Sequence, residues 1–193
     1  MFALLVSVAV WLANSGTPPP GRTGAPGDGL CSDCHSNSAT QQGTITLAGL
    51  PATITPNATY VLTITNTKTM GDPASKAGFQ MVMLNSNNQN TGDFLAPPGS
   101  GSQLAMSGGR EYWEHLNAPT YPGNNMVSWT VSWKAPVSPP NTTITAYFVG
   151  NIANGNGGSS GDRIVTNTAS GTLDGGANPL QASITNSVNV LCF

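Results

Sequence analysis

The segment that most constrains this chain is Cys31-Ser-Asp-Cys34-His35, two cysteines separated by two residues and followed at once by a histidine. This spacing is the attachment signature of a c-type haem. Each thiol forms a thioether with a haem vinyl group, and the histidine becomes the proximal iron ligand. A short helical turn places the two sulfurs and directs the imidazole inwards. We therefore expect one covalent haem c, held by Cys31, Cys34 and His35.

Two other kinds of site use a similar cysteine spacing. A zinc site needs a second pair of ligands, and a thioredoxin-type dithiol needs a βαβ context. The remaining candidates, Cys192 and His115, do not form a second CxxC or an HxxxH pair. The spacing therefore favours covalent haem over either alternative.

The sequence specifies the second protein ligand of the haem iron, opposite His35, less closely. The sequence has 2 histidines, so His115, in a loop-rich stretch, is the histidine expected to complete a bis-histidine site. The methionines that compete for this role are Met70, Met106 and Met126, whereas Met81 and Met83 fall in an expected strand and suit core packing. An open or water-bound iron is the third alternative. A methionine raises the reduction potential, and an open site permits ligand binding or peroxidase chemistry.

Composition indicates what kind of domain carries this motif. The 193 residues suit one domain with a proper core. Charged residues make up 7% of the chain, against ~25% in typical proteins, and Gly, Pro, Ser, Thr and Asn take their place. Such a composition favours short strands joined by tight turns. The net charge of −2 gives no case for nucleic-acid binding, which needs a basic face.

Strand-like alternation recurs between residues 44 and 173, and turn residues separate the strands. The expected strands are 44–47, 60–65, 78–84, 127–133 and 143–149, with a turn at 50–56 and loops at 85–92, 97–109, 117–125 and 151–161. This spacing predicts an all-β fold, an antiparallel β-sandwich. Residues 16–43 are rich in Gly and Pro and form the haem-attachment arm.

Both ends of the chain are unusual. Residues 1–15 are apolar, too short to span a bilayer and without the charged n-region of a signal peptide. Their alternation favours a strand, with a short buried helix as the alternative. Residues 174–193 read as a linker followed by an amphipathic strand, either the last strand of the sandwich or an insertion into a neighbouring subunit. Cys192 is unpaired or linked to another chain.

Several side chains near these motifs carry weaker expectations. Arg22 and Arg110 flank the ligand-bearing segments and suit haem propionates or a solvated surface. Tyr112 and Trp113, beside His115, are expected to contact the porphyrin.

Other side chains have simpler expectations. Trp129 and Trp133 share one strand face and are expected in the core. Glu111 and Glu114 have no nucleophile beside them, so we expect them to be solvated.

Three motifs together resemble a known family. They are Thr23-Gly-Ala-Pro-Gly27, Trp129-Thr-Val-Ser-Trp133-Lys-Ala-Pro136, and Gly150-Asn-Ile-Ala-Asn-Gly-Asn-Gly157 through Gly161-Asp162. They resemble bacterial choice-of-anchor V domains, which are similar to the Reeler (reelin N-terminal) β-sandwich, over residues 22–173. The resemblance implies a Reeler- or immunoglobulin-like sandwich with an irregular haem-binding N-terminal arm. In that family a histidine commonly precedes the tryptophan strand, which matches His115.

The expected function follows from the haem and from the two ends of the chain. Thioether attachment takes place outside the cytoplasm, so the protein is exported to the cell surface or beyond. We expect a monohaem c-type cytochrome that transfers electrons without enzymatic turnover and has no membrane span. The terminal strands predict a homo-oligomer or extracellular filament, with other redox proteins as partners. The alternatives are a structural or adhesive surface protein whose haem staples the arm, and a haem-based sensor or peroxidase with an open sixth site.

Overall fold

The computed structural model of the protein describes residues 16–73, 75–95, 101–137, 139 and 141–175. Within them a short 3-10 turn, η1 (Cys31–Asp33), precedes the strands. The strands are β1 (Ser36–Asn37), β2 (Gln42–Ala48), β3 (Thr53–Ile54), β4 (Thr59–Met70), β5 (Lys76–Asn85), β6 (Asp93–Leu95), β7 (Ser102–Ser107), β8 (Arg110–His115), β9 (Met126–Lys134), β10 (Thr143–Ala153) and β11 (Ser160–Leu173).

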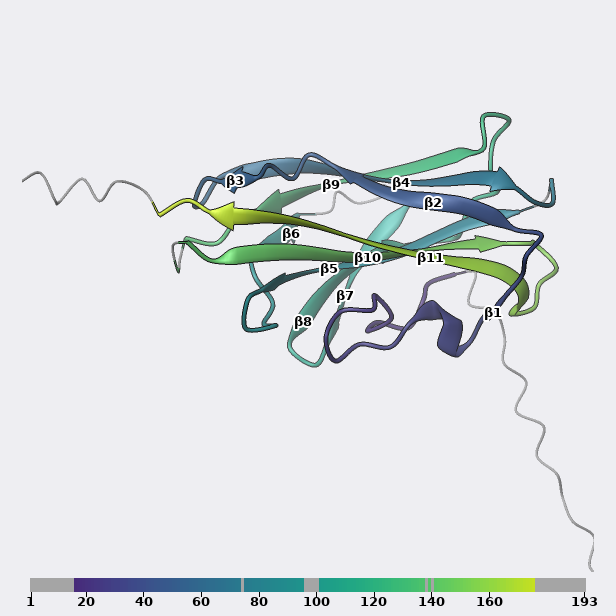
Figure 1. Ribbon diagram of the computed structural model, residues 1–193, viewed down its shortest axis with the longest axis horizontal. Coiled ribbons are helices and arrows are strands. Elements are labelled where there is room, and N and C mark those ends of the chain that lie inside the picture. The colour runs from purple at the N-terminus through teal and green to yellow at the C-terminus, as the bar shows by residue number, and fades with distance from the viewer. Residues whose placement is uncertain (1–15, 74, 96–100, 138, 140, 176–193) are drawn as a thin grey trace, which may run out of the picture.

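The strands form two sheets that face each other (Figure 1). The larger sheet has the order β1-β11-β10-β5-β8-β7, with β3 also beside β11, and the smaller sheet has the order β2-β4-β9-β6. Neighbouring strands run antiparallel except for β1 and β3, which pair in parallel with β11. The predicted antiparallel β-sandwich is confirmed.

The alternating segments of the sequence form strands where they were expected, in β2, β4, β5, β9 and β10. Four expectations were wrong. The loop expected at 97–109 contains β7, and the turn at 50–56 contains the short β3. The loop expected at 151–161 is shorter, because β10 continues to Ala153 and β11 begins at Ser160. His115 is the last residue of β8 rather than part of a loop.

Large side chains from both sheets fill the space between them. Phe79 of β5 lies at the centre, with ring centroids 4.7 Å from Trp113 and 4.6 Å from Trp129. Trp129 and Trp133 are buried, as expected for core residues. Burial of such a side chain contributes about 1.5–3 kcal/mol. Trp113 is also fully buried in this core, so the expectation that it contacts a porphyrin was wrong.

The N-terminal arm lies on the outer face of the larger sheet, where it covers a second apolar cluster. Ala25 of the arm packs there with Val82, Leu84 and Tyr112. The side chains of β5 are therefore buried on both faces of the sheet. Figure 1 shows the arm, in purple, on the side of this sheet away from the smaller sheet.

The two terminal segments on which the assembly predictions rest, 1–15 and 176–193, lie outside the described residues, as does Cys192. No helix in the described part of the chain is long and apolar enough to cross a membrane.

Candidate functional site

The CxxCH segment forms a tight turn at the end of the arm. Cys31–Asp33 is a single 3-10 turn, and the backbone N–H groups of Cys34 and His35 both donate to the carbonyl of Cys31, at 3.2 and 2.9 Å. The Asp33 carboxylate fixes the turn from outside, since it accepts from the Leu30 backbone N–H and pairs with Arg22 at 2.6 Å. The short helical turn expected from the spacing is present.

Strand pairing brings distant segments together at one end of the larger sheet. Gly78 of β5 lies opposite Asn151 of β10, which in turn lies opposite Ile164 of β11. On the other side of β5, Gln80 pairs with Glu114, one residue before the end of β8. The start of β5, the ends of β8 and β10 and the start of β11 therefore meet at this end.

A pocket lies where these strand ends meet the arm. Its cavity measures about 320 Å³, within the size range of small-molecule sites. All four of the expected site residues line it, and they come from two distant parts of the chain: Cys31, Cys34, His35 and His115. Phe79 and Ala118 add apolar wall, and Gly155, Gly157 and Gly158 of the β10–β11 loop complete one side.

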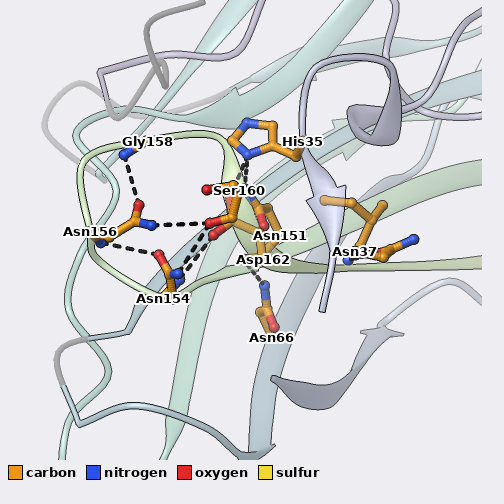
Figure 2. Close-up of polar contacts among 10 residues, drawn as sticks. His35, Asn37, Asn66, Asn151, Asn154, Asn156, Gly158, Ser160 and Asp162 are labelled. Carbon is orange, nitrogen blue, oxygen red and sulfur yellow. Dashed lines mark hydrogen bonds and ion pairs between the residues drawn. The ribbon is translucent and has the colours of Figure 1, made fainter. Parts of the chain in front are cut away.

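His35 is held by a buried carboxylate that lies 127 residues further along the chain (Figure 2). Its Nδ1 lies 2.5 Å from Oδ2 of Asp162, whose side chain is 0% exposed. The Asn151 amide lies 3.3 Å from the same nitrogen. Because Nδ1 donates its proton to the carboxylate, Nε2 is the ring nitrogen left to bind a metal.

The loop that carries Asp162 is cross-linked by its own side chains (Figure 2). The side-chain amides of Asn154 and Asn156 both donate to the carbonyl of Ser160, each at 3.1 Å. The backbone N–H of Gly158 donates to Oδ1 of Asn156 at 2.7 Å, and the N–H of Asn154 donates to Oδ1 of Asp162 at 3.0 Å. The motif around Gly150–Asp162 thus builds a pocket wall and orients one carboxylate.

His115 reaches the pocket from the end of β8 and is 6% exposed. Its Nδ1 lies 3.1 Å from the backbone nitrogen and 3.2 Å from the carbonyl oxygen of Phe79. The ring rests against Gly78, where an added Cβ would stand 2.9 Å from Cε1 of His115. The absence of a side chain at Gly78 is therefore what makes room for the imidazole.

The charges around the pocket are few. Arg22 and Lys76 both line it, and both are cations that suit carboxylates such as haem propionates. Burial raises the pKa of the Cys31 thiol to about 12, against a smaller lowering by the Arg22 guanidinium. In the folded protein this thiol is therefore protonated at neutral pH.

The other expected contacts lie elsewhere. None of the described methionines lines the pocket, and Met70, Met106 and Met126 are exposed. Met81 and Met83 are core residues, as expected. Arg110 pairs with Asp28 of the arm at 2.6 Å.

Two further expectations near the pocket were wrong. Tyr112 donates to Asp28 at 2.9 Å instead of facing the pocket. Glu114 is 1% exposed rather than solvated, and it accepts hydrogen bonds from the amides of Gln80 and Gln103. Glu111 accepts from the Phe94 backbone N–H and is only partly exposed.

A bare metal ion and a porphyrin need different donors from the pocket. Within the described residues, no group of three or more His, Cys, Asp or Glu side chains is arranged to hold a metal ion. A porphyrin is different, because it supplies four iron ligands itself and needs two from the protein. A thiol pair for attachment and two histidines on one pocket fit that requirement.

No protein-family model and no curated protein matches this sequence. The chain is similar to the crystal structure of the reelin-N domain of F-spondin, with 14% identity, a TM-score of 0.47 and coverage of 75% of this chain and 95% of that domain.

Two other solved structures illustrate the range of similar proteins. For the human F-spondin reeler domain the identity is 14%, the TM-score 0.45 and the coverage 72% and 94%. For AggA, the major subunit of aggregative adherence fimbriae type I from Escherichia coli, the identity is 15%, the TM-score 0.40 and the coverage 72% and 98%. At these identities and TM-scores, the likenesses carry no inference about function.

Proposed function

We propose that this chain is an exported monohaem c-type cytochrome that transfers electrons. One observation carries the proposal: the two thiols of the CxxCH turn, its histidine and the second histidine of the chain line the same pocket. Export follows from the chemistry of attachment, since thioether bonds to haem are made outside the cytoplasm.

Each residue of the pocket has a separate task in this proposal. Cys31 and Cys34 tether the group, and His35, held through Nδ1 by Asp162, offers Nε2 to the iron. His115 offers a ligand from the end of β8. Bound haem supplies an iron that alternates between ferric and ferrous states. The apolar walls at Phe79 and Ala118 exclude water, and Arg22 and Lys76 are placed to neutralise propionates.

The position of His115 favours an electron carrier over a sensor or peroxidase. An iron with an open site would require that no pocket side chain other than His35 could bind it, and His115 lines the same pocket. The described methionines are absent from the wall, so they do not compete. A saturated iron suits electron transfer.

The contacts of the arm weigh against a haem that mainly staples it. Asp28 accepts hydrogen bonds from Arg110, Tyr112 and Thr23 at 2.6, 2.9 and 2.6 Å. The Arg22 backbone N–H donates to Gln80 at 2.6 Å. These bonds fix the arm on the sheet through the protein's own side chains, so the haem is not required for that purpose.

We further propose that the protein assembles with copies of itself into an extracellular filament, with other redox proteins as electron partners. The low charge of the sequence supports this, because a surface with 7% charged residues gives little protection against association. The apolar segment 1–15 supplies side chains that need burial.

The covalent attachment is the point to test first. The purified protein, denatured and extracted with acid-acetone, should keep its haem and give a c-type pyridine haemochrome spectrum. Cys31→Ser and Cys34→Ser should each leave one thioether and shift that spectrum, and the double variant should release the haem. Ser32→Ala, inside the same motif, is the matched control and should behave as the wild type. Haem stripped from the wild-type protein by acid-acetone would overturn the attachment.

A further inference from the structure

Asp162 is a buried carboxylate, and each of its two oxygens has a hydrogen-bond partner. Oδ2 lies 2.5 Å from His35 Nδ1, and Oδ1 accepts from the Asn154 backbone N–H at 3.0 Å. The side chain is 0% exposed. Burying a carboxylate is costly unless hydrogen bonds compensate it, and here one of the two bonds goes to the proximal histidine.

We propose that Asp162 is a positioning residue for the iron: it fixes His35 in the tautomer with the proton on Nδ1 and makes its Nε2 a stronger electron donor. The inference rests on the proposed function and adds a determinant of the reduction potential. A carboxylate that accepts from the far nitrogen of a metal-binding histidine orients the ring and raises its basicity.

The direction of the effect follows from charge. A more basic ligand and a nearby buried negative charge both stabilise the ferric state, which carries one more positive charge than the ferrous state. Asp162 therefore lowers the reduction potential. The Nδ1 of His115 instead contacts the backbone of Phe79, at 3.1 Å from its nitrogen and 3.2 Å from its carbonyl oxygen.

Asp162→Asn is the variant that isolates this effect. An asparagine has one oxygen in place of two. If that oxygen faces His35, the acceptor is neutral, and we expect the ratio of reduced to oxidised protein at a fixed potential to rise about tenfold, equivalent to about 59 mV for one electron. If the amide nitrogen faces His35 instead, it forces the proton onto Nε2 and blocks the bond to iron, which gives a high-spin spectrum.

Asp28→Asn is the matched control, since it also converts a buried carboxylate to an amide. Its side chain is 4% exposed and pairs with Arg110 rather than with a pocket histidine. We expect the potential and the low-spin spectrum of this variant to equal those of the wild type. An Asp162→Asn protein with unchanged potential and unchanged spectrum would overturn the role of Asp162, as would an equal shift in Asp28→Asn.

A measurement on the wild-type holoprotein covers the case in which Asp162→Asn does not fold. In the ferrous state, proton NMR should show the His35 Nδ1 proton far downfield and slow to exchange with solvent, because a buried carboxylate holds it. A fast-exchanging His35 ring proton would contradict the proposal. Wild-type protein without covalent haem would instead count against the proposed function, so the two failures are distinguishable.

Discussion

The imidazole of His115 rests on Gly78, so closely that a Cβ at that glycine would stand 2.9 Å from Cε1 and 3.2 Å from Nδ1 of the ring. Gly78→Ala should therefore push the ring out of its place, with a loss of about 1–3 kcal/mol in the free energy of unfolding. The low-spin spectrum of the haem protein should weaken with it. Urea denaturation and absorption spectra measure the two effects.

Gly123→Ala is the control for this substitution, because an added Cβ there meets nothing within 4 Å. We expect its stability and spectrum to match the wild type. Equal behaviour of the two alanine variants would contradict the packing argument.

His115→Ala removes the second histidine of the pocket. We expect the absorption spectrum to change from low-spin to high-spin, since none of the described methionines lines the pocket to replace it. Met106→Ala is the matched control, with a side chain that is 68% exposed, and should keep the wild-type spectrum. A low-spin spectrum that survives His115→Ala would assign the sixth position to another group.

Glu114 should make stability depend on pH. Burial raises its pKa above the ordinary 4.5, and hydrogen bonds from Gln103 and Gln80 offset part of the rise. The unfolded chain therefore loses this proton first, so the folded state binds more protons once the pH exceeds about 4.5. The contribution of Glu114 to the free energy of unfolding is full below that pH and falls as pH rises through the raised folded pKa.

The comparison of wild type with Glu114→Gln isolates this group. The variant loses one hydrogen-bond acceptor, which adds an offset independent of pH. The difference in the free energy of unfolding, wild type minus variant, should decrease from pH 4 to pH 7 in urea titrations. A difference that stays constant or increases over this range would show that burial does not penalise the charged carboxylate.

Substitution of Arg110 tests whether the protein's own side chains or the haem fix the N-terminal arm on the sheet. Its guanidinium pairs with Asp28 and donates to the carbonyls of Pro26 and Asn88 at 2.7 and 3.0 Å. Arg110→Ala leaves the buried Asp28 carboxylate short of a partner, at a cost of about 1–3 kcal/mol. Limited proteolysis should cut the arm faster even with the haem attached, whereas Lys134→Ala, an exposed control on β9, should not change the rate. Unchanged cleavage in Arg110→Ala would favour the haem as the staple.

Assembly is tested at the N-terminal segment. Deletion of residues 2–13 should give a monomer in light scattering with an unchanged haem spectrum, because the apolar side chains that need burial are removed. Deletion of residues 177–193 tests in the same way whether the second terminal segment is needed for assembly. A truncated protein that still forms filaments, or a full-length protein that is monomeric at high concentration, would contradict the filament proposal.

The sequence predicted strands where one face of the chain is consistently apolar. Ile64 and Trp129 lie opposite each other in neighbouring strands, and both belong to alternating segments that were recognised. β11 was missed because its residues Thr166–Thr168 are exposed polar side chains with no apolar alternation. β7 was missed because it follows a Gly/Pro/Ser stretch and carries Met106 on an exposed position.

Part of the candidate site could be predicted from the sequence. The CxxCH spacing predicted Cys31, Cys34 and His35 as site residues, and the small number of histidines pointed to His115. All four line the pocket. Asp162 was quoted only as part of a family motif, and its contact with His35 depends on how β1 pairs with β11, which places Asn37 beside Asp162. No local pattern specifies a contact between residues that far apart.

The raised pKa of Cys31 bears on when haem could be attached in the cytochrome proposed above. A thiolate is the reactive form of cysteine, and a pKa of about 12 leaves very little of it in the folded protein. For the cytochrome proposed above, this favours attachment of haem while the CxxCH segment is still unfolded and open to water. The contact between Asp162 and His35 would then form after the thioether bonds.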